Sequence, residues 1–260
     1  MKQFITLFIK EFREATRSFK LLWMPLVFLS LGISDPLVNF YMDDIMASVG
    51  NMPEGFEFSL PEFQPVDLLV ASTGQFQSIG LVVLVAIFAS SISRERQNGT
   101  AVFLYARPLN FTAYFFSKYV VALCISILCA VLGYGGSVYY TTILYGHIDV
   151  MHALYMTAGY CLWLLFVLAF TLCMSAMFKT AVSMFVSLIV FVAGSLIDSI
   201  IGSFWSYSPF KLATYSVEFV GSGVSHEHFW QTALLTIVLT IICVILGIVM
   251  SKRNIKKLVL

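Results

Sequence analysis

Residues 76–96 read FQSIGLVVLVAIFASSISRER, a largely apolar run that gives way abruptly to charged residues at Arg94. The apolar part approaches the roughly 20 residues that an α-helix needs to cross about 30 Å of hydrocarbon. Inside a bilayer such a segment must be helical, because a helix satisfies all of its own backbone polar groups. Residues 76–92 therefore predict a membrane-spanning helix that ends where the charges begin.

Five more apolar runs of similar or greater length occur along the chain. The whole chain of 260 residues is 59% hydrophobic and 11% charged, whereas soluble domains carry about 25% charged residues. We therefore expect an all-α membrane protein that forms a single transmembrane domain over residues 1–260. Its six transmembrane helices are predicted at residues 21–42, 76–92, 119–145, 150–178, 181–204 and 230–250.

The charges are sorted between the two sides of these predicted spans. Of the 15 Lys and Arg residues, 14 lie at residues 2–20, 94–118, 179 and 252–257, and only three of the 14 acids lie among them. One side thus sums to 14 − 3 = +11 and the other to 1 − 11 = −10. Because basic residues that flank spans stay in the cytoplasm, we expect a multi-pass protein of a bacterial cell membrane with both termini in the cytoplasm.

The basic residues lie beside apolar spans, so anionic membrane lipid is their expected partner and nucleic acid is not. Residues 1–20 place Phe4, Phe8 and Phe12 at helical spacing opposite a basic face, which predicts an amphipathic helix at the membrane interface. Residues 34–36 read Ser-Asp-Pro, a cap-like sequence that predicts a break in the first span. The segment of residues 43–73, which is rich in acidic residues, is predicted to form an outer loop.

Two shorter helices are expected outside the spans. Residues 205–229 predict an outer interfacial helix and loop, with Ser208 as the cap, Pro209 at the first position and Gly221 at the end. Residues 94–118 predict a cytoplasmic loop that carries a short helix over residues 101–106, capped by Thr100 and ended by Arg107-Pro108. The apolar side chains of this second helix need a lipid or protein partner; they are Val102, Phe103 and Leu104.

This cytoplasmic loop resembles the signature of permease subunits of ATP-binding-cassette exporters of the ABC-2 transporter class. The resemblance rests on Glu95, on the pair Gly99-Thr100 with the apolar stretch that follows, on Pro108 and on the downstream Lys118. It covers nearly the whole chain once the amphipathic start, the six spans and the helix before the last span are included. One departure is that Ala101 and its apolar neighbours stand where the family often has an acid.

The resemblance implies a role for each part of the loop. The short helix would be a coupling helix that docks into a groove of a separate ATP-binding subunit, which carries ATP and Mg. Glu95 and Arg96 would form charged contacts at that interface, and Val102, Phe103 and Leu104 would fill the groove. The motif residues Gly99, Thr100 and Pro108 would belong to the same interface. A second permease copy, identical or related, would complete the transporter. The alternative interpretation is a solvated loop with ordinary lipid-facing basic residues.

The resemblance also implies a translocation path, because the family builds its central cavity from the second and fifth spans of two protomers. In this chain the candidate lining residues are Phe88, Met184, Phe185 and Phe191, although all four could equally face lipid. The cargo expected to move outward is apolar or amphipathic, such as a peptide, a lipid or a drug.

The sequence itself offers little chemistry. It has no G-x-x-x-x-G-K-[ST] loop to bind ATP phosphates, so we expect no nucleotide and no other cofactor in this chain. His226 and His228 do not share a helix face, so no metal site is expected. An integral membrane enzyme would need a polar cluster at one depth, and the spans hold only Asp35 and Asp198 as carboxylates. A channel or a secondary transporter stays open as an alternative.

Overall fold

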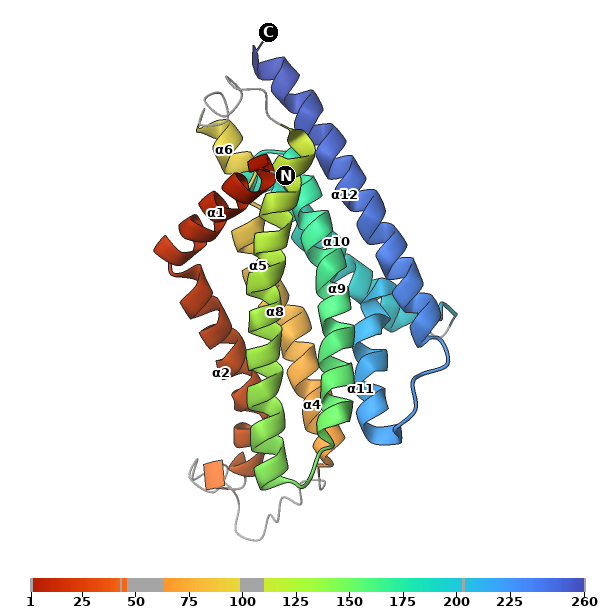
Figure 1. Cartoon of the computed structure of the whole chain (residues 1–260). Coiled ribbons are helices and arrows are strands. Elements are labelled where there is room, and N and C mark those ends of the chain that lie inside the picture. The colour runs from red at the N-terminus through yellow and green to blue at the C-terminus, as the bar shows by residue number, and fades with distance from the viewer. Residues whose placement is uncertain (1, 43, 46–62, 99–109, 203, 260) are drawn as a thin grey trace.

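A computed structural model describes residues 2–42, 44–45, 63–98, 110–202 and 204–259, and it contains helices and no strand within these ranges. Six of its helical segments are long and apolar enough to cross a membrane. This confirms the predicted all-α membrane protein with six transmembrane helices. The chain starts and finishes at the same end of the bundle, which we call the termini end (Figure 1).

The first half of the chain supplies an interfacial helix and three spans. α1 (Lys2–Arg17) precedes the first span, α2 (Lys20–Phe40). The second span is built from four consecutive pieces, which are α4 (Pro65–Gln75), the π-helical turn η1 (Phe76–Gly80), α5 (Leu81–Phe88) and α6 (Ser93–Gln97). The third span is α8 (Phe111–Leu144).

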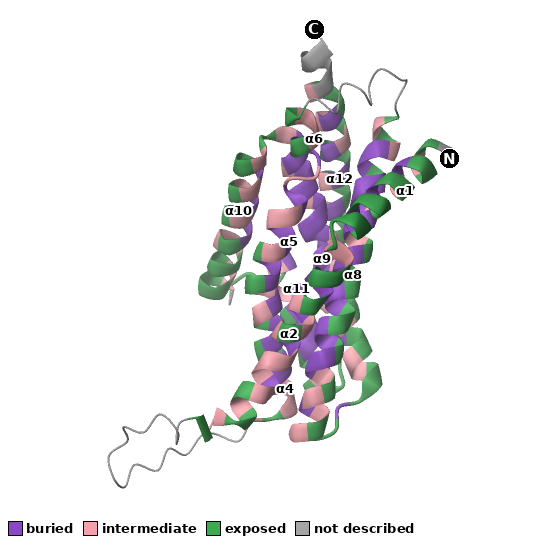
Figure 2. Cartoon of the chain, turned by 90° about the vertical axis from the view of Figure 1, so that its left-hand side faces the viewer, coloured by how far each residue is buried: buried purple, intermediate pink, exposed green. Residues whose placement is uncertain are grey.

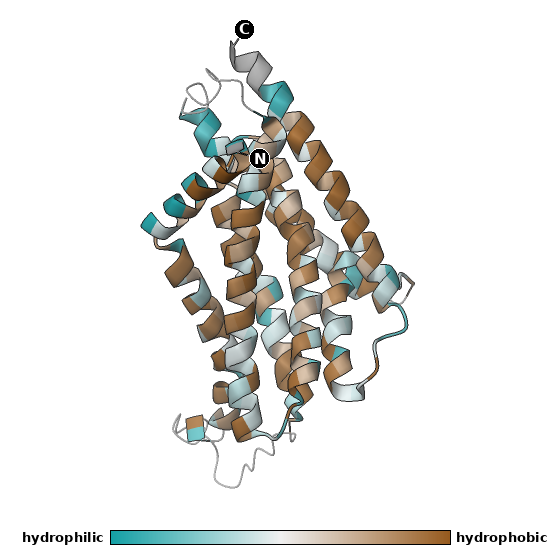
Figure 3. Ribbon diagram, in the orientation of Figure 1, coloured by the Kyte–Doolittle hydropathy of each residue, from teal (hydrophilic) through white to brown (hydrophobic). Residues whose placement is uncertain are grey.

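The second half contributes three spans and one shorter helix. α9 (Val150–Met177) and α10 (Thr180–Ile201) are the fourth and fifth spans. The short 3₁₀ turn η2 (Pro209–Lys211) leads into α11 (Leu212–Ser222), and α12 (Phe229–Val259) is the last helix. Figure 3 shows apolar residues along most of α12, with hydrophilic residues close to the termini end.

The core of the bundle lies around α8 and α9. α2 packs mainly against α8, and α12 packs mainly against α9. In an apolar stretch of 18 residues within α9, 67% of the residues are buried, whereas in the corresponding stretch of α10 only 11% are buried. α10 therefore stands at the edge of the bundle with most of its apolar surface uncovered (Figure 2).

Glycines allow α2 and α8 to approach closely. A Cβ atom placed on Gly32 would lie 2.1 Å from the carbonyl oxygen of Gly133, which is far inside van der Waals contact. A Cβ on Gly136 would lie 2.7 Å from the Leu29 side chain. Small residues at these positions bring two helix backbones together, as is usual in membrane bundles. Gly135 lies on another face and meets nothing within 4 Å.

The second span begins earlier than the sequence suggested, which corrects the predicted outer loop of residues 43–73. α4 starts at Pro65, and the Asp67 carboxylate accepts the backbone N–H of Gln64 at 2.9 Å as a helix-start signal. Two polar residues at the end of the predicted loop are paired inside the bundle. Ser72 Oγ lies 2.8 Å from Ser137 Oγ, and Thr73 Oγ1 lies 2.9 Å from the Tyr134 hydroxyl.

The predicted break at residues 34–36 was also wrong, because α2 runs through them without interruption. Pro36 removes one backbone donor, but helix packing keeps the segment helical. Asp35 does not cap a new helix; its Oδ1 instead accepts a hydrogen bond of 2.7 Å from Gln75 Nε2 on α4. A side-chain contact between spans therefore takes the place of the expected cap.

The segment before the last span agrees in part with the sequence. Ser208 Oγ accepts the N–H of Phe210 as expected, and Pro209 opens the helical turn. The helix ends at Gly223 rather than at Gly221, because Gly223 adopts the left-handed conformation with φ of 67°. α11 packs against α9 and α4, so its inner face is buried in protein.

Candidate functional site

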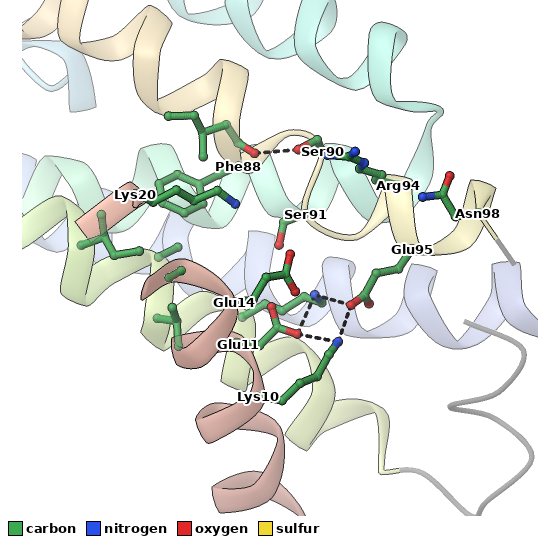
Figure 4. Close-up of a pocket in the computed structure, with 16 residues that line it drawn as sticks. Lys10, Glu11, Glu14, Lys20, Phe88, Ser90, Ser91, Arg94, Glu95 and Asn98 are labelled. Atoms are coloured by element: carbon green, nitrogen blue, oxygen red, sulfur yellow. Dashed lines mark hydrogen bonds and ion pairs between the residues drawn. The ribbon is translucent and has the colours of Figure 1, made fainter. Parts of the chain in front are cut away.

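Four charged side chains from three helices meet at the termini end (Figure 4). Lys10 and Glu11 come from α1, Glu95 from α6 and Lys118 from α8. Lys10 Nζ lies 2.5 Å from Glu95 Oε1 and 3.1 Å from Glu11 Oε1. Lys118 Nζ lies 2.9 Å from Glu11 Oε1 and 3.1 Å from Glu95 Oε1. Each cation therefore touches both carboxylates, and we call this arrangement the four-charge cluster.

The four-charge cluster is partly shielded from solvent. The side chain of Lys118 is 2% exposed, that of Glu11 10% and that of Glu95 15%, whereas Lys10 is 41% exposed. Tyr114 on α8 adds a hydrogen bond of 2.6 Å from its hydroxyl to Glu95 Oε2. Such a buried cluster depends on every charge having its partner, because an unpaired buried charge costs several kcal/mol, about 3–5.

The local field holds Lys10 in its charged form. Burial would lower the pKa of Lys10, but the charges of Glu11 and Glu95 and their hydrogen bonds outweigh it and raise the pKa above its ordinary value. Lys10 is therefore protonated throughout the physiological pH range. The link between α1 and α6 consequently does not switch with ordinary changes in pH.

α6 is also anchored by the last turn of α9 and by Phe178, which follows it. Arg96 donates to the carbonyl oxygen of Ala176 at 2.6 Å and also to that of Phe178. Asn254 on α12 donates to the same Ala176 oxygen at 2.8 Å. In addition, Ser175 Oγ accepts the backbone N–H of Ser93 at 3.0 Å. The helix that leads into residues 99–109 is thus tied to both halves of the bundle.

A cavity of about 420 Å³ lies among α4, η1, α5, α9, α10, η2 and α11. Its wall is mixed, since Phe191 and Phe210 lie beside polar residues such as Gln77 and Asp198. Trp163 also lines it, and the buried Trp163 Nε1 has no hydrogen-bond partner among the described residues. We call this the outer cavity; its lining offers both apolar surface and hydrogen-bonding groups.

Comparison with known proteins identifies the family of this chain. A family model described as "ABC-2 family transporter protein" matches residues 58–196, just over half of the chain. The chain belongs to the ABC-2 family of transporter proteins. It is also 28% identical over 180 residues to the uncharacterized transmembrane protein YxlG of Bacillus subtilis (strain 168), an alignment that covers 69% of this chain and 70% of YxlG. The protein is thus the membrane component of a transporter.

The ABC-2 match covers part of the four-charge cluster. Glu95 and Lys118 lie within the matched residues, whereas Lys10 and Glu11 precede them. The structure shows both residues in contacts within their own chain, Glu95 with Lys10 and Arg96 with the carbonyl oxygen of Ala176. The other predicted interface residues lie outside the described residues, as does the predicted coupling helix over residues 101–106; they are Gly99, Thr100, Val102, Phe103, Leu104 and Pro108.

The four residues predicted to line an ABC-2 translocation path are not gathered in one place. Phe88 is buried and lines a cavity beside the four-charge cluster. Phe191 is buried and lines the outer cavity. Met184 is half-buried against the core, and Phe185 is 63% exposed on the outside of α10. Of the four, Phe191 is the one that joins the polar groups of the outer cavity.

The cluster does not fit a bound metal ion. Carboxylate oxygens of Glu11, Glu14 and Glu95 lie within 4.8 Å of one another, which is close enough to share a cation. However, the ammonium groups of Lys10 and Lys118 already lie against Glu11 and Glu95. These two fixed cations supply the positive charge that a metal would otherwise bring.

Sequence reasoning missed Lys10 and Glu11 as members of the site, and it named Lys118 only as part of the family motif. A usable signal was present in α1. Leu7, Glu11 and Ala15 are spaced four residues apart, so they share a face, and all three are buried. An acid on a buried stripe predicts a buried partner charge, and Lys118 is that partner.

Proposed function

We propose that this ABC-2 protein is the permease subunit of an exporter driven by ATP on a separate ATP-binding-cassette chain. A second permease, identical or related, would form the other half of the pathway. ATP and Mg would be held by the partner, and this chain would perform no covalent chemistry. The termini end would face the cytoplasm, and the cargo, an apolar or amphipathic peptide, lipid or drug, would move outward.

The four-charge cluster is the observation that carries the proposal. It links α6, which leads directly into residues 99–109, to α1 and to α8, which begins directly after them. A force applied to the loop would therefore act at once on the interfacial helix and on a span at the centre of the bundle. Because core packing and paired charges transmit displacement with little compression, this is suitable geometry for coupling.

The edge position of α10 supports a pathway shared with a second permease. Its uncovered face carries large apolar side chains, among them Phe185, Ile189 and Ile200. In a lone chain this face would meet lipid, whereas in a pair it would meet the second copy. The outer cavity lies between this helix and the core, so its mixed lining supports an amphipathic cargo.

The proposal is tested by purifying the chain with a candidate ATP-binding-cassette protein of the same organism and measuring ATP hydrolysis in nanodiscs. The permease should stimulate hydrolysis. Deleting residues 101–106 should abolish the stimulation. Glu95→Ala removes an ion-pair partner of both Lys10 and Lys118 and should lower the stimulation at least about tenfold, which corresponds to about 1.4 kcal/mol of lost coupling. The matched control is Glu14→Ala, which removes a nearby carboxylate that has no ion pair with a described residue.

Three results would contradict the proposal. Activity of the permease without any ATPase would favour a channel or a secondary transporter. Unchanged stimulation after deletion of residues 101–106 would remove the coupling role of that segment. An equal loss in Glu14→Ala and Glu95→Ala would show that general surface charge, rather than the ion-paired cluster, controls the complex.

A further inference from the structure

A cavity of about 550 Å³ lies beside the four-charge cluster, enclosed by α1, α5, α6, α8 and the first residue of α2. Its volume is within the usual range of ligand sites, about 300–1,000 Å³. Seven charged residues line it, with four cations and three carboxylates, which gives 4 − 3 = +1. We call it the headgroup cavity for the reasons that follow.

The positive charge of the headgroup cavity is not evenly spread. Lys10 and Lys118 are neutralised by Glu11 and Glu95. The third carboxylate, Glu14, also lies toward this cluster, within 4.8 Å of the other two. The remaining cations, Lys20 and Arg94, form no ion pair with any described residue.

Lys20 and Arg94 both line the cavity, as do two serines. In Figure 4 Ser90 lies beside Arg94, Ser91 lies between Ser90 and Glu14, and the Lys20 side chain approaches from the opposite side, away from Lys10. Lys20 is half-buried and Arg94 is exposed. The Ser90 hydroxyl donates to the carbonyl oxygen of Ile87 at 2.8 Å, so the Ser91 hydroxyl is the candidate donor beside the two cations. Cationic side chains and a hydroxyl are donors that phosphate oxygens prefer, so these groups suit a phosphate-sized anion.

The rest of the lining is apolar and lies deeper in the bundle. Ile87 precedes Arg94 by seven residues, which is about 10 Å along a helix of 1.5 Å rise per residue. From α8, Val121, Ala122 and Ile125 continue the apolar wall. The order from the end of the span inward is therefore cation, hydroxyl and hydrocarbon, which is the order of groups along a phospholipid.

The surroundings show how a lipid would reach the cavity. Lys20 is the first residue of a span, and Arg94 follows the apolar part of another, so both lie at the depth of lipid headgroups. α1 exposes the apolar side chains of Ile5, Ile9 and Phe12, which indicates that it lies on the membrane interface. The cavity is lined by α1 and by these two cations, so it lies at the depth of the lipid headgroups at the termini end.

From this arrangement we propose that the headgroup cavity binds one anionic phospholipid of the leaflet at the termini end, with its phosphate between Lys20 and Arg94 and an acyl chain along Ile87 and Ala122. The bound lipid would join the start of α2 to the start of α6, next to the four-charge cluster. The proposal concerns binding by this chain alone, so its test does not depend on the transport function proposed above.

The test is native mass spectrometry of the full chain in detergent, titrated with phosphatidylglycerol and, separately, with phosphatidylcholine. One phosphatidylglycerol should stay bound per chain, more tightly than phosphatidylcholine. Replacing both cations, Lys20→Gln with Arg94→Gln, should weaken phosphatidylglycerol binding about 30-fold, from roughly 1 kcal/mol per basic residue. The matched control is Arg13→Gln with Arg17→Gln, two basic residues of α1 that do not line the headgroup cavity, and it should change the affinity less than about threefold.

A charge-conserving pair, Lys20→Arg with Arg94→Lys, should keep the affinity within about threefold, and this separates lost charge from lost fold. Free glycerol 1-phosphate should not displace the lipid, because the apolar wall contributes to binding. Equal weakening in the control pair would reduce the effect to general surface charge and overturn the site. Displacement by the free phosphate at similar concentration would overturn the lipid as its occupant.

Discussion

The ammonium group of Lys118 lies 2.9 Å from the carboxylate of Glu11, although 107 residues separate the two in the sequence. Lys118 is almost fully buried, so we predict that Lys118→Met leaves two carboxylates with one partly exposed cation. The variant should lose about 3–5 kcal/mol of stability, the usual cost of breaking a buried pair. Thermal unfolding in detergent measures this, with exposed Lys252→Met as the control. A change below about 1 kcal/mol would show that the cluster is not a structural link.

The contact between Lys10 and Glu95 gives a charge-swap experiment. Lys10→Glu alone places a third carboxylate in the cluster and should reduce both the stability of the chain and its stimulation of ATP hydrolysis by the partner. Adding Glu95→Lys restores two cations and two carboxylates, so the double variant should recover at least part of both losses. Arg13→Glu on the exposed face of α1 is the matched control. Strictly additive losses in the double variant would argue against direct coupling of these two side chains.

The helical architecture could be predicted from the sequence because apolar runs long enough to cross a bilayer must form helices, and the uneven distribution of charge orients them. Apolar runs predicted all six spans, and α10 and α9 begin within one residue of their expected starts. The sequence failed where tertiary contacts override local signals. Asp35 and Pro36 read as a helix start, yet Gln75 binds Asp35 and α2 continues.

The candidate site was harder to predict than the fold. Glu95 was recognisable from the family motif, but its partners come from α1 and α8, which no local pattern pairs with it. Such long-range pairing depends on how the helices cross, and hydrophobic periodicity does not specify that crossing. In the structure Glu95 is held by Lys10 and Lys118 of its own chain, and its contact with an ATP-binding subunit stays a prediction.

The close approach of Gly32 to Gly133 predicts a sharp effect of one methyl group. In Gly32→Ala the new Cβ would lie 2.1 Å from a backbone oxygen, so α2 or α8 must move. We expect a loss of about 1–3 kcal/mol, typical of overpacking. Gly135→Ala is the control, because a Cβ there meets nothing within 4 Å. Equal thermal stability of the two variants would contradict the close packing of α2 on α8.

The orientation proposed for the chain predicts a labelling pattern. In a background without native cysteines, Ser18→Cys lies at the termini end, and His147→Cys lies in the exposed turn between α8 and α9 at the opposite end. A membrane-impermeant maleimide should label His147→Cys in intact cells and Ser18→Cys only after permeabilisation. The reverse pattern would place the positive residues outside and remove the basis for a cytoplasmic ATPase partner.

The outer cavity predicts a variant that separates transport from ATP hydrolysis. Asp198 lies far from the termini end, since it is 18 residues along α10 from Thr180, or about 27 Å. Asp198→Asn keeps the shape of the side chain and removes only its charge, so hydrolysis without cargo should be unchanged. If a cationic amphipath is the cargo, its stimulation of hydrolysis and its transport should both fall, by about fivefold for about 1 kcal/mol of lost attraction.

Ser199→Ala is the uncharged control, because Ser199 also lines the cavity. Transport that is unchanged in Asp198→Asn and in Phe191→Ala would exclude the outer cavity from the path, because neither its charge nor its aromatic wall would then contact the cargo.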